Sequence, residues 1–243
     1  MVMKEGFDVA GRHPDNQDPT KQFAIGAARS LLENAGVIDP SPTVETSSVA
    51  APVENPVAKI PETRVEIKRF SKEQKEALEK QGFVIYGLTG QSIKTLRDAG
   101  RKFWSTWHKE LPDFEALGSM HSEVAINPNK PFLPKSNNKT LAQQEDMVGK
   151  YSAEVAKKVP GVKAIIGQAP DYVELAFAHL DSTKEYLFGA KDNYDYARTK
   201  TPTSSSGVAD VGDFRADVGL GVNDWDAGHG DGIVHAAPLV VPV

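Results

Sequence analysis

The stretch DFRADVGLGV, residues 213–222, decides the fold class, because apolar residues alternate along it with a period of two. Such alternation is typical of a β-strand that buries one face. The apolar side chains point one way, and Asp213, Arg215 and Asp217 point the other way. We therefore predict one strand over residues 213–222, with the stretch IVHAAPLVVPV, residues 233–243, as its antiparallel hairpin partner.

Ahead of this stretch, the apolar spacing is helical in some segments and strand-like in others. Ser71 with Gln74 and Thr140 with Gln143 form two capping boxes, which predict a helix over residues 72–81 and the start of the longest helix. Further helices are expected in residues 89–100 and 169–180, and strands in residues 83–86, 101–107, 122–126 and 161–167. Helices and strands that alternate and then end in an antiparallel hairpin predict a single α+β domain with a mixed sheet.

The N-terminal quarter of the chain has a different composition. Residues 1–20 are polar and rich in Asp, Asn and Pro, and we expect them to be disordered. Residues 21–36 have helical apolar spacing and predict a short amphipathic helix. Residues 37–63 hold five prolines without a helical period, which is typical of a linker, so the globular domain is expected over residues 64–243. A short helix on such a linker predicts a protein partner that binds residues 21–36.

Composition narrows the classes of function. Cysteine is absent from the 243 residues, which excludes thiol nucleophiles, disulfides and Cys-ligated metal centres. The formal net charge is -5, and residues 207–243 account for all of it, with six aspartates, one arginine and neither Lys nor Glu. Duplex nucleic acid is therefore not expected as a partner of that surface. The chain shows neither a secretory h-region nor a run of about twenty apolar residues, so we expect a cytoplasmic protein without a membrane segment.

Three stretches resemble hypothetical proteins from poorly characterised bacterial lineages. They are GFVIYGLTGQSIKTLRDAGRKFWSTWH (residues 82–108), SEVAINPNKPFLPKSN (residues 122–137) and PLVVPV (residues 238–243). The resemblance spans about residues 70–243. It implies no activity and no site residues, because no activity is assigned to those proteins.

The stretch NDWDAGHGDGIVH, residues 223–235, raises the question of a metal site, since Asp and His are both metal ligands. It lacks the spacing and the final Glu of an EF-hand loop. We therefore expect DAGHGDG, residues 226–232, to be an exposed hairpin connection with left-handed glycines, local hydrogen bonds from Asp226 and Asp231, and no carboxylate partner for His229. The alternative is a hydrolytic centre with a divalent ion bound by Asp213, Asp217, Asp224 and His235. A charge ladder of Asp213, Arg215 and Asp217 competes with that alternative.

A second candidate is the loop NPNKPFLPKSNNKT, residues 127–140, which holds three lysines and no acidic residue. Lys130, Lys135 and Lys139, together with the helix N-terminus at Thr140, would suit a phosphate or carboxylate. The glycines and the GK[ST] ending of a P-loop are absent. The alternative is a solvated loop in which Thr140 only caps the helix.

Two weaker patterns complete the candidates. Asp171 and Glu174 share one face of a predicted helix, where they could perform acid–base chemistry or simply favour the helix N-terminus. Aromatic residues cluster with basic ones in KFWSTWH (residues 102–108) and YDYARTK (residues 194–200), where they could stack on bases or sugars or belong to the core.

None of these patterns completes a catalytic motif. Our leading hypothesis is a soluble binding or interaction module with a tethered N-terminal docking helix. The alternatives are a metal-dependent hydrolase built on the four Asp and His residues and a structural component of a larger assembly. No cofactor motif is evident, and a divalent metal is the cofactor that the hydrolase hypothesis requires.

Overall fold

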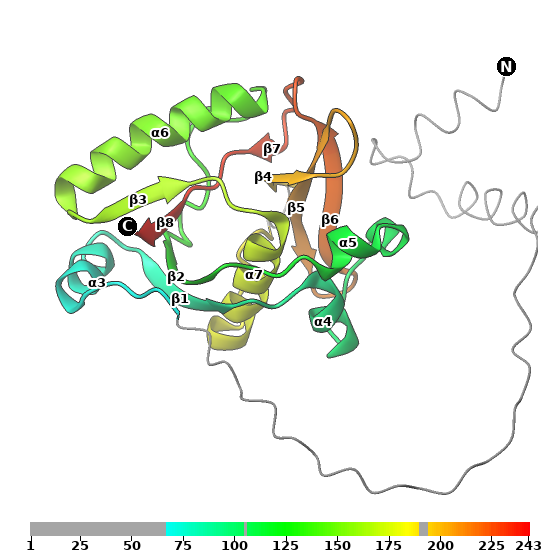
Figure 1. Ribbon diagram of the computed structural model, residues 1–243, viewed down its shortest axis with the longest axis horizontal. Coiled ribbons are helices and arrows are strands. Elements are labelled where there is room, and N and C mark those ends of the chain that lie inside the picture. The colour runs from blue at the N-terminus through cyan, green and yellow to red at the C-terminus, as the bar shows by residue number, and fades with distance from the viewer. Residues whose placement is uncertain (1–66, 105, 190–193) are drawn as a thin grey trace, which may run out of the picture. The chain divides into compact units, whose positions relative to one another are not determined.

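Two four-stranded sheets and one central helix form the framework of this protein (Figure 1). The computed structural model describes residues 67–104, 106–189 and 194–243, all within one compact unit, Val65–Val243. The predictions for residues 1–20, 21–36 and 37–63, and for a domain start at residue 64, lie outside the described residues.

The first sheet is antiparallel throughout. It contains β1 (Val84–Thr89), β2 (His121–Ile126), β3 (Val162–Ile165) and β8 (Leu239–Pro242). Their order is β1-β2-β8-β3, so β8 lies between two strands that are far from it in the sequence. All four residues of β8 are buried, as expected for a strand inside a sheet that is covered on both faces.

The second sheet is mixed. It contains β4 (Tyr196–Pro202), β5 (Gly207–Arg215), β6 (Gly219–Asp226) and β7 (Val234–His235), in the order β6-β5-β4-β7. The pairs β4–β5 and β5–β6 are antiparallel, whereas β4 and β7 are parallel. The predicted α+β class with a mixed sheet is therefore confirmed.

The helices begin where local capping chemistry predicts. They are α3 (Lys72–Glu79), α4 (Ile93–Asp98), α5 (Pro112–Ala116), α6 (Leu141–Lys158) and α7 (Ala169–Thr183), with a 3-10 helix η2 (Trp107–Glu110). Both predicted capping boxes, Ser71 with Gln74 and Thr140 with Gln143, are formed. Among the described helices, none combines the length and the apolar character needed to cross a bilayer.

The core has two parts on either side of the first sheet. Helix α7 is buried on almost every side, and it packs between the first sheet and strands β4 and β5 of the second. Helices α3 and α6 cover the opposite face of the first sheet, where Leu78, Val148 and Val155 pack against Ala125 and Val240. The order of layers is thus α3 and α6, first sheet, α7, second sheet (Figure 1).

The prediction of one strand over residues 213–222 is wrong. Strand β5 ends at Arg215, and β6 begins at Gly219 after a tight turn, so this stretch is itself the antiparallel hairpin. Gly219 has φ 101°, a left-handed conformation that only glycine adopts easily. The apolar alternation continues across the turn because the paired residues Val211 and Val222 point to the same face of the hairpin, and both are buried in the core.

The prediction that residues 233–243 form the antiparallel partner of this stretch is also wrong. Residues 234–235 pair in parallel with β4, and residues 239–242 join the first sheet. Between them, Pro238 cannot donate a backbone hydrogen bond, which allows the chain to leave one sheet for the other. Among the described residues of 101–107, Phe103 forms an isolated bridge with Leu220 and Trp107 begins η2, so they do not form the predicted strand. The stretch YDYARTK contains most of β4, which was not predicted.

Candidate functional site

The four residues of the predicted metal centre do not converge. Asp213 Oδ1 lies 2.8 Å from Arg215 Nε, so Arg215 occupies the place beside this carboxylate. Burial raises the pKa of Asp213, and Arg215 opposes that shift. Asp217 lies in the exposed turn between β5 and β6 and not on a strand beside Asp213. The premise that both aspartates lie on one strand is therefore wrong.

The other two predicted ligands have partners elsewhere. Asp224 accepts a hydrogen bond from Thr203 Oγ1 at 3.4 Å. His235 Nε2 lies 3.1 Å from Asp195 Oδ1, and its ring stacks on Phe132 with centroids 4.9 Å apart. Across residues 67–104, 106–189 and 194–243, no group of three or more Asp, Glu or His side chains is placed to hold a metal ion.

The stretch DAGHGDG connects β6 to β7, which are not hairpin neighbours. Asp226 accepts from the Gly228 amide at 2.7 Å and Asp231 from the Ile233 amide at 2.8 Å, as predicted. The predicted hairpin is therefore wrong, and two further details differ from the prediction. His229 Nδ1 lies 3.0 Å from Asp226 Oδ1, and the glycines of this loop do not adopt left-handed conformations.

A buried arginine organises this loop. Arg198 on β4 is 0% exposed, and its guanidinium donates to the carbonyl oxygens of Asp226 and His229, each at 2.9 Å. In the sequence, Arg198 is only one member of an aromatic and basic cluster, and nothing there predicts this role. The loop is thus a structural connection whose carbonyl groups are bound by the buried Arg198 guanidinium. Asp226 and Asp231 accept hydrogen bonds from backbone amides within the loop.

The predicted anion site at the start of α6 is already filled by the chain itself. The amide of Leu141 donates to the Ala227 carbonyl at 2.8 Å, and the amide of Gln143 donates to Thr140 Oγ1 at 3.3 Å. These are the groups that a phosphate would need. Lys135 and Lys139 do not line the groove that Lys130, nearer the start of the loop, helps to form.

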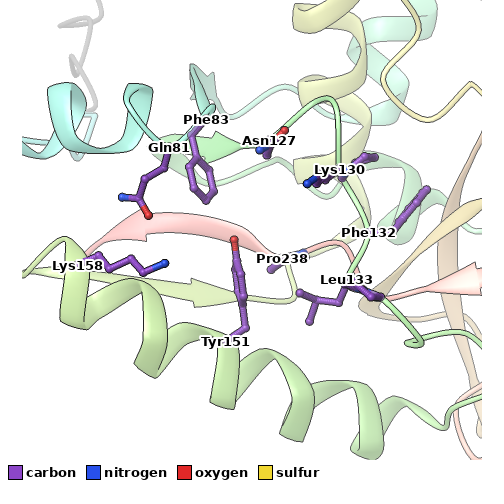
Figure 2. Close-up of a pocket in the computed structure, with 11 residues that line it drawn as sticks. Gln81, Phe83, Asn127, Lys130, Phe132, Leu133, Tyr151, Lys158 and Pro238 are labelled. Carbon is purple, nitrogen blue, oxygen red and sulfur yellow. The ribbon is translucent and has the colours of Figure 1, made fainter.

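That groove has a volume of 590 Å³ and is open to solvent (Figure 2). It is formed where the residues before β1, the loop after β2, helix α6 and the residue before β8 meet. Its lining consists of Gln81, Phe83, Asn127, Lys130, Pro131, Phe132, Leu133, Pro134, Tyr151, Lys158 and Pro238. Tyr151 and Phe83 reach into it from opposite sides in Figure 2.

The loop that forms one wall of the groove is held rigidly. Buried Gln144 on α6 donates through Nε2 to the carbonyls of Ser136 and Val234, at 2.8 and 3.1 Å. Ser136 Oγ accepts from the Ala236 amide at 3.0 Å, and the Leu133 amide donates to the Ala236 carbonyl at 2.9 Å. The wall is therefore preformed, which lowers the entropic cost of binding.

The groove combines an apolar floor with positive charge. Lys130 and Lys158 are exposed, and neither forms an ion pair with any other described residue. No carboxylate is among the described lining residues. Tyr151 is half-buried, and burial raises the pKa of its hydroxyl. The side-chain amides of Gln81 and Asn127 add groups that can both donate and accept hydrogen bonds.

The helix carboxylates Asp171 and Glu174 are structural ties. Glu174 accepts from the Thr89 amide at 3.0 Å, from Thr89 Oγ1 at 2.7 Å and from Ser119 Oγ. Asp171 accepts from the amides of Met120 and Gln168, each at 2.7 Å. Burial raises the pKa of Asp171, and these two amides oppose that shift. Both carboxylates hold one end of the β1–β2 pair onto α7, where β1 ends and β2 begins, and the acid–base alternative has no support in this geometry.

Three comparisons bear on relationships to known proteins. No protein-family model, no curated protein and no solved structure matches this chain. The function must therefore be argued from the geometry alone.

Proposed function

We propose that this protein is a binding module whose groove takes an extended peptide segment that carries an apolar or proline side chain next to an acidic residue. The observation that carries the proposal is the pairing of Lys130 and Lys158, both free of described ion-pair partners, with an apolar floor that includes Phe83 and Tyr151. Aromatic and proline-lined grooves suit extended peptides, and lysines at the rim select a carboxylate.

A peptide fits this groove better than a compact small molecule does. Sites for small molecules enclose most of their ligand, whereas this groove is open to solvent. The side-chain amides of Gln81 and Asn127 match the donor and acceptor of a peptide bond. The rigid wall around Ser136 keeps the groove in shape without a ligand.

Residues 21–36 provide the second part of the proposal. A short amphipathic helix ahead of a proline-containing linker would dock into a groove of a protein partner, while the folded domain engages an extended segment of the same partner. Once one contact has formed, the linker keeps the second binding surface close to its target, which raises the effective concentration for the second contact. Such a module binds tightly only to partners that offer both surfaces.

The test of the groove uses an array of decapeptides with one acidic residue and one proline or aromatic residue at varied spacing, probed with the full-length protein. The best peptide is then titrated by fluorescence anisotropy. We expect the double variant Lys130→Glu/Lys158→Glu to lose at least about tenfold in affinity, because each lysine is replaced by a repelling charge. Tyr151→Ala is expected to weaken the binding of the same peptide, since it removes an aromatic side chain from the floor of the groove.

The matched control is Lys157→Glu, which makes the same charge change one residue away on α6. Lys157 pairs with Glu154 and does not line the groove. Equal binding to the parent protein and to Lys130→Glu/Lys158→Glu would refute the proposal, as would an equal loss in Lys157→Glu.

The helix is tested in the full-length chain with Leu31→Asp/Leu32→Asp. This variant should leave the affinity for the array peptide unchanged, because the groove is intact. It should weaken the binding of a protein partner that carries that peptide sequence. An unchanged affinity for such a partner would remove residues 21–36 from the proposal and leave the groove.

A further inference from the structure

The two outer strands of the first sheet differ in how their edges are protected. The strand order β1-β2-β8-β3 leaves β1 at one edge and β3 at the other (Figure 1). On β3, the amide of Ala164 donates to Ser152 Oγ of α6 at 2.8 Å, and the charged side chain of Lys163 is exposed. A covering helix and an exposed lysine are features that keep an edge strand from pairing with another chain.

The register with β2 decides which backbone groups of β1 point outward. The amide of Glu123 on β2 donates to the Lys68 carbonyl at 2.7 Å, so it does not bond to Gly87, its register partner on β1. In an antiparallel pair, residues that bond to the neighbouring strand alternate with residues that point away from it. Gly87, and Ile85 two residues before it, therefore direct both of their backbone groups to the outer edge.

The open part of this edge is limited to Ile85 and Gly87. Their outward amides and carbonyls have no hydrogen-bond partner among the described residues. The next outward amides on either side do have partners. The amide of Phe83 donates to the Leu78 carbonyl at 3.2 Å, and the amide of Thr89 donates to a carboxylate oxygen of α7 at 3.0 Å.

Strand β1 lacks the features that protect β3. Its sequence VIYGLT holds no charged residue and no proline, and its register with β2 runs without a bulge. Val84 and Gly87 are both exposed. An uncharged, regular edge of this kind is a template for pairing with another strand.

A second copy of the same strand matches this edge. When two copies of β1 pair antiparallel about a two-fold axis at Tyr86, Ile85 of each copy lies opposite Gly87 of the other. This register uses every free outward group. A two-fold axis at Ile85 would need the amide of Phe83, and an axis at Gly87 would need the amide of Thr89, and both amides are already bonded.

The side chains at these two positions are also complementary. Ile85 points to the face of the sheet that α3 and α6 cover, where it is partly buried. Gly87 belongs to the same face, and a β-carbon built there would meet no atom within 4 Å. In the paired strands, the Ile85 side chain of each copy lies over the bare Gly87 of the other.

We propose that this protein forms a two-fold symmetric dimer through antiparallel pairing of β1, which joins the first sheets of two copies into one continuous sheet. A second copy is the partner because the free backbone groups and the contact between Ile85 and Gly87 are self-complementary. The contact is short, so the dimer is weak and reversible. The proposal does not depend on the peptide proposal.

Sedimentation velocity of the full-length protein, at concentrations from micromolar to millimolar, measures the dimer. Gly87→Glu is the test variant, because its side chain has room in the monomer but meets Ile85 of the second copy in the dimer. The control is Gly149→Glu, the same change at an exposed glycine of α6, where an added β-carbon also meets no atom within 4 Å. We expect Gly87→Glu to raise the dimer dissociation constant at least about tenfold and Gly149→Glu to leave it unchanged.

Amide hydrogen exchange of the ¹⁵N-labelled parent protein locates the contact without any substitution. Exchange is carried out at micromolar and at millimolar concentrations and is then read by NMR. The amides of Ile85 and Gly87 should exchange quickly at the low concentration and become protected at the high one. The amides of Tyr86 and Leu88, which point at β2, are internal controls and should be protected at both. This measurement decides the proposal even if Gly87→Glu fails to fold.

The proposal is overturned if the parent protein stays monomeric at millimolar concentration or if its dimer survives Gly87→Glu. It is also overturned if the amides of Ile85 and Gly87 exchange at the same rate at both concentrations. Growth into oligomers larger than a dimer would contradict it as well, because two-fold pairing leaves no further β1 edge to extend.

Discussion

Gly230 lies directly against the backbone of Asn138, in the loop that leads into α6. A β-carbon at Gly230 would come 2.7 Å from the Asn138 carbonyl oxygen and 2.7 Å from the Lys139 amide nitrogen. The Asn138 amide also donates to the carbonyl oxygen of Asp231 at 2.6 Å. The glycine-rich stretch is thus one half of a loop-to-loop contact that links β7 to the start of α6.

This contact predicts that Gly230→Ala destabilises the domain. These neighbours are backbone atoms that cannot rotate away, so the loops must separate, and overpacking of this kind costs about 1–3 kcal/mol. Gly228→Ala is the control, since its β-carbon would meet only the Asp226 carboxylate, at 3.2 Å. Urea denaturation of both variants measures the difference, and equal stabilities would contradict the expectation.

Arg198→Lys is expected to lower the free energy of unfolding by at least about 2 kcal/mol, because a lysine cannot donate to both loop carbonyls and hydrogen bonds to charged groups contribute about 1.5–3 kcal/mol each. Limited proteolysis should then cleave within residues 226–232. Arg101→Lys, at the exposed pair with Asp181, should cost less than about 1 kcal/mol. A loss at Arg198 no larger than that at Arg101 would show that the loop does not need the guanidinium.

Stability should fall as the pH rises from about 6.5 to 8. Burial raises the pKa of Asp210 to about 8, whereas an unfolded Asp titrates near pH 4, so the folded state keeps a proton that the unfolded chain has lost. The free energy of unfolding should therefore fall by up to about 1.4 kcal/mol per pH unit. His179, whose pKa burial lowers from its ordinary value, titrates below this range.

Asp210→Asn checks the assignment of that pH dependence. The amide keeps the shape of the neutral carboxyl, so the slope should flatten and the variant should be more stable than the parent protein at pH 8. Asp217→Asn, in the exposed turn, should keep the slope of the parent protein. Denaturation at a series of pH values gives all three slopes, and a parent-like slope in Asp210→Asn would assign it to another group.

Glu174→Ala should destabilise the domain by about 1–3 kcal/mol, because it leaves the buried Ser119 hydroxyl without its acceptor and removes the hydrogen bonds from Thr89. Glu79→Ala, at an exposed helical position, should change stability by less than about 0.5 kcal/mol. Thermal unfolding of both variants measures this. If Glu174→Ala unfolds like the parent protein, the carboxylate is free for a chemical role.

Local chemistry was predictable from the sequence, and distant contacts were not. The capping boxes at Ser71 and Thr140 depend on residues three positions apart, so a pattern search finds them. The turn after Arg215 was missed because Ala216, Asp217 and Val218 continue the apolar alternation, and only Gly219 marks the change of direction.

The sites were harder to predict than the fold. The groove is made of four segments that the fold brings together, and only Lys130 among its residues had been selected as a candidate. The role of Arg198 depends on two carbonyl groups about thirty positions away, which no composition or spacing signals. The composition of residues 226–232 suggested a metal site, yet Asp226 and Asp231 accept hydrogen bonds from backbone amides within the loop.

The position of β8 has a consequence for how the chain reaches this structure. Strands β2 and β3 are joined only through β8, so the first sheet stays in two pieces until residues 239–242 have been synthesised. Contacts between such distant segments raise the contact order and slow folding, because a long loop must close before any pairing is gained. On the ribosome, the β1–β2 hairpin would wait with an exposed strand edge while the rest of the domain emerges. We expect this open edge to make the nascent chain more prone to aggregation than the folded protein.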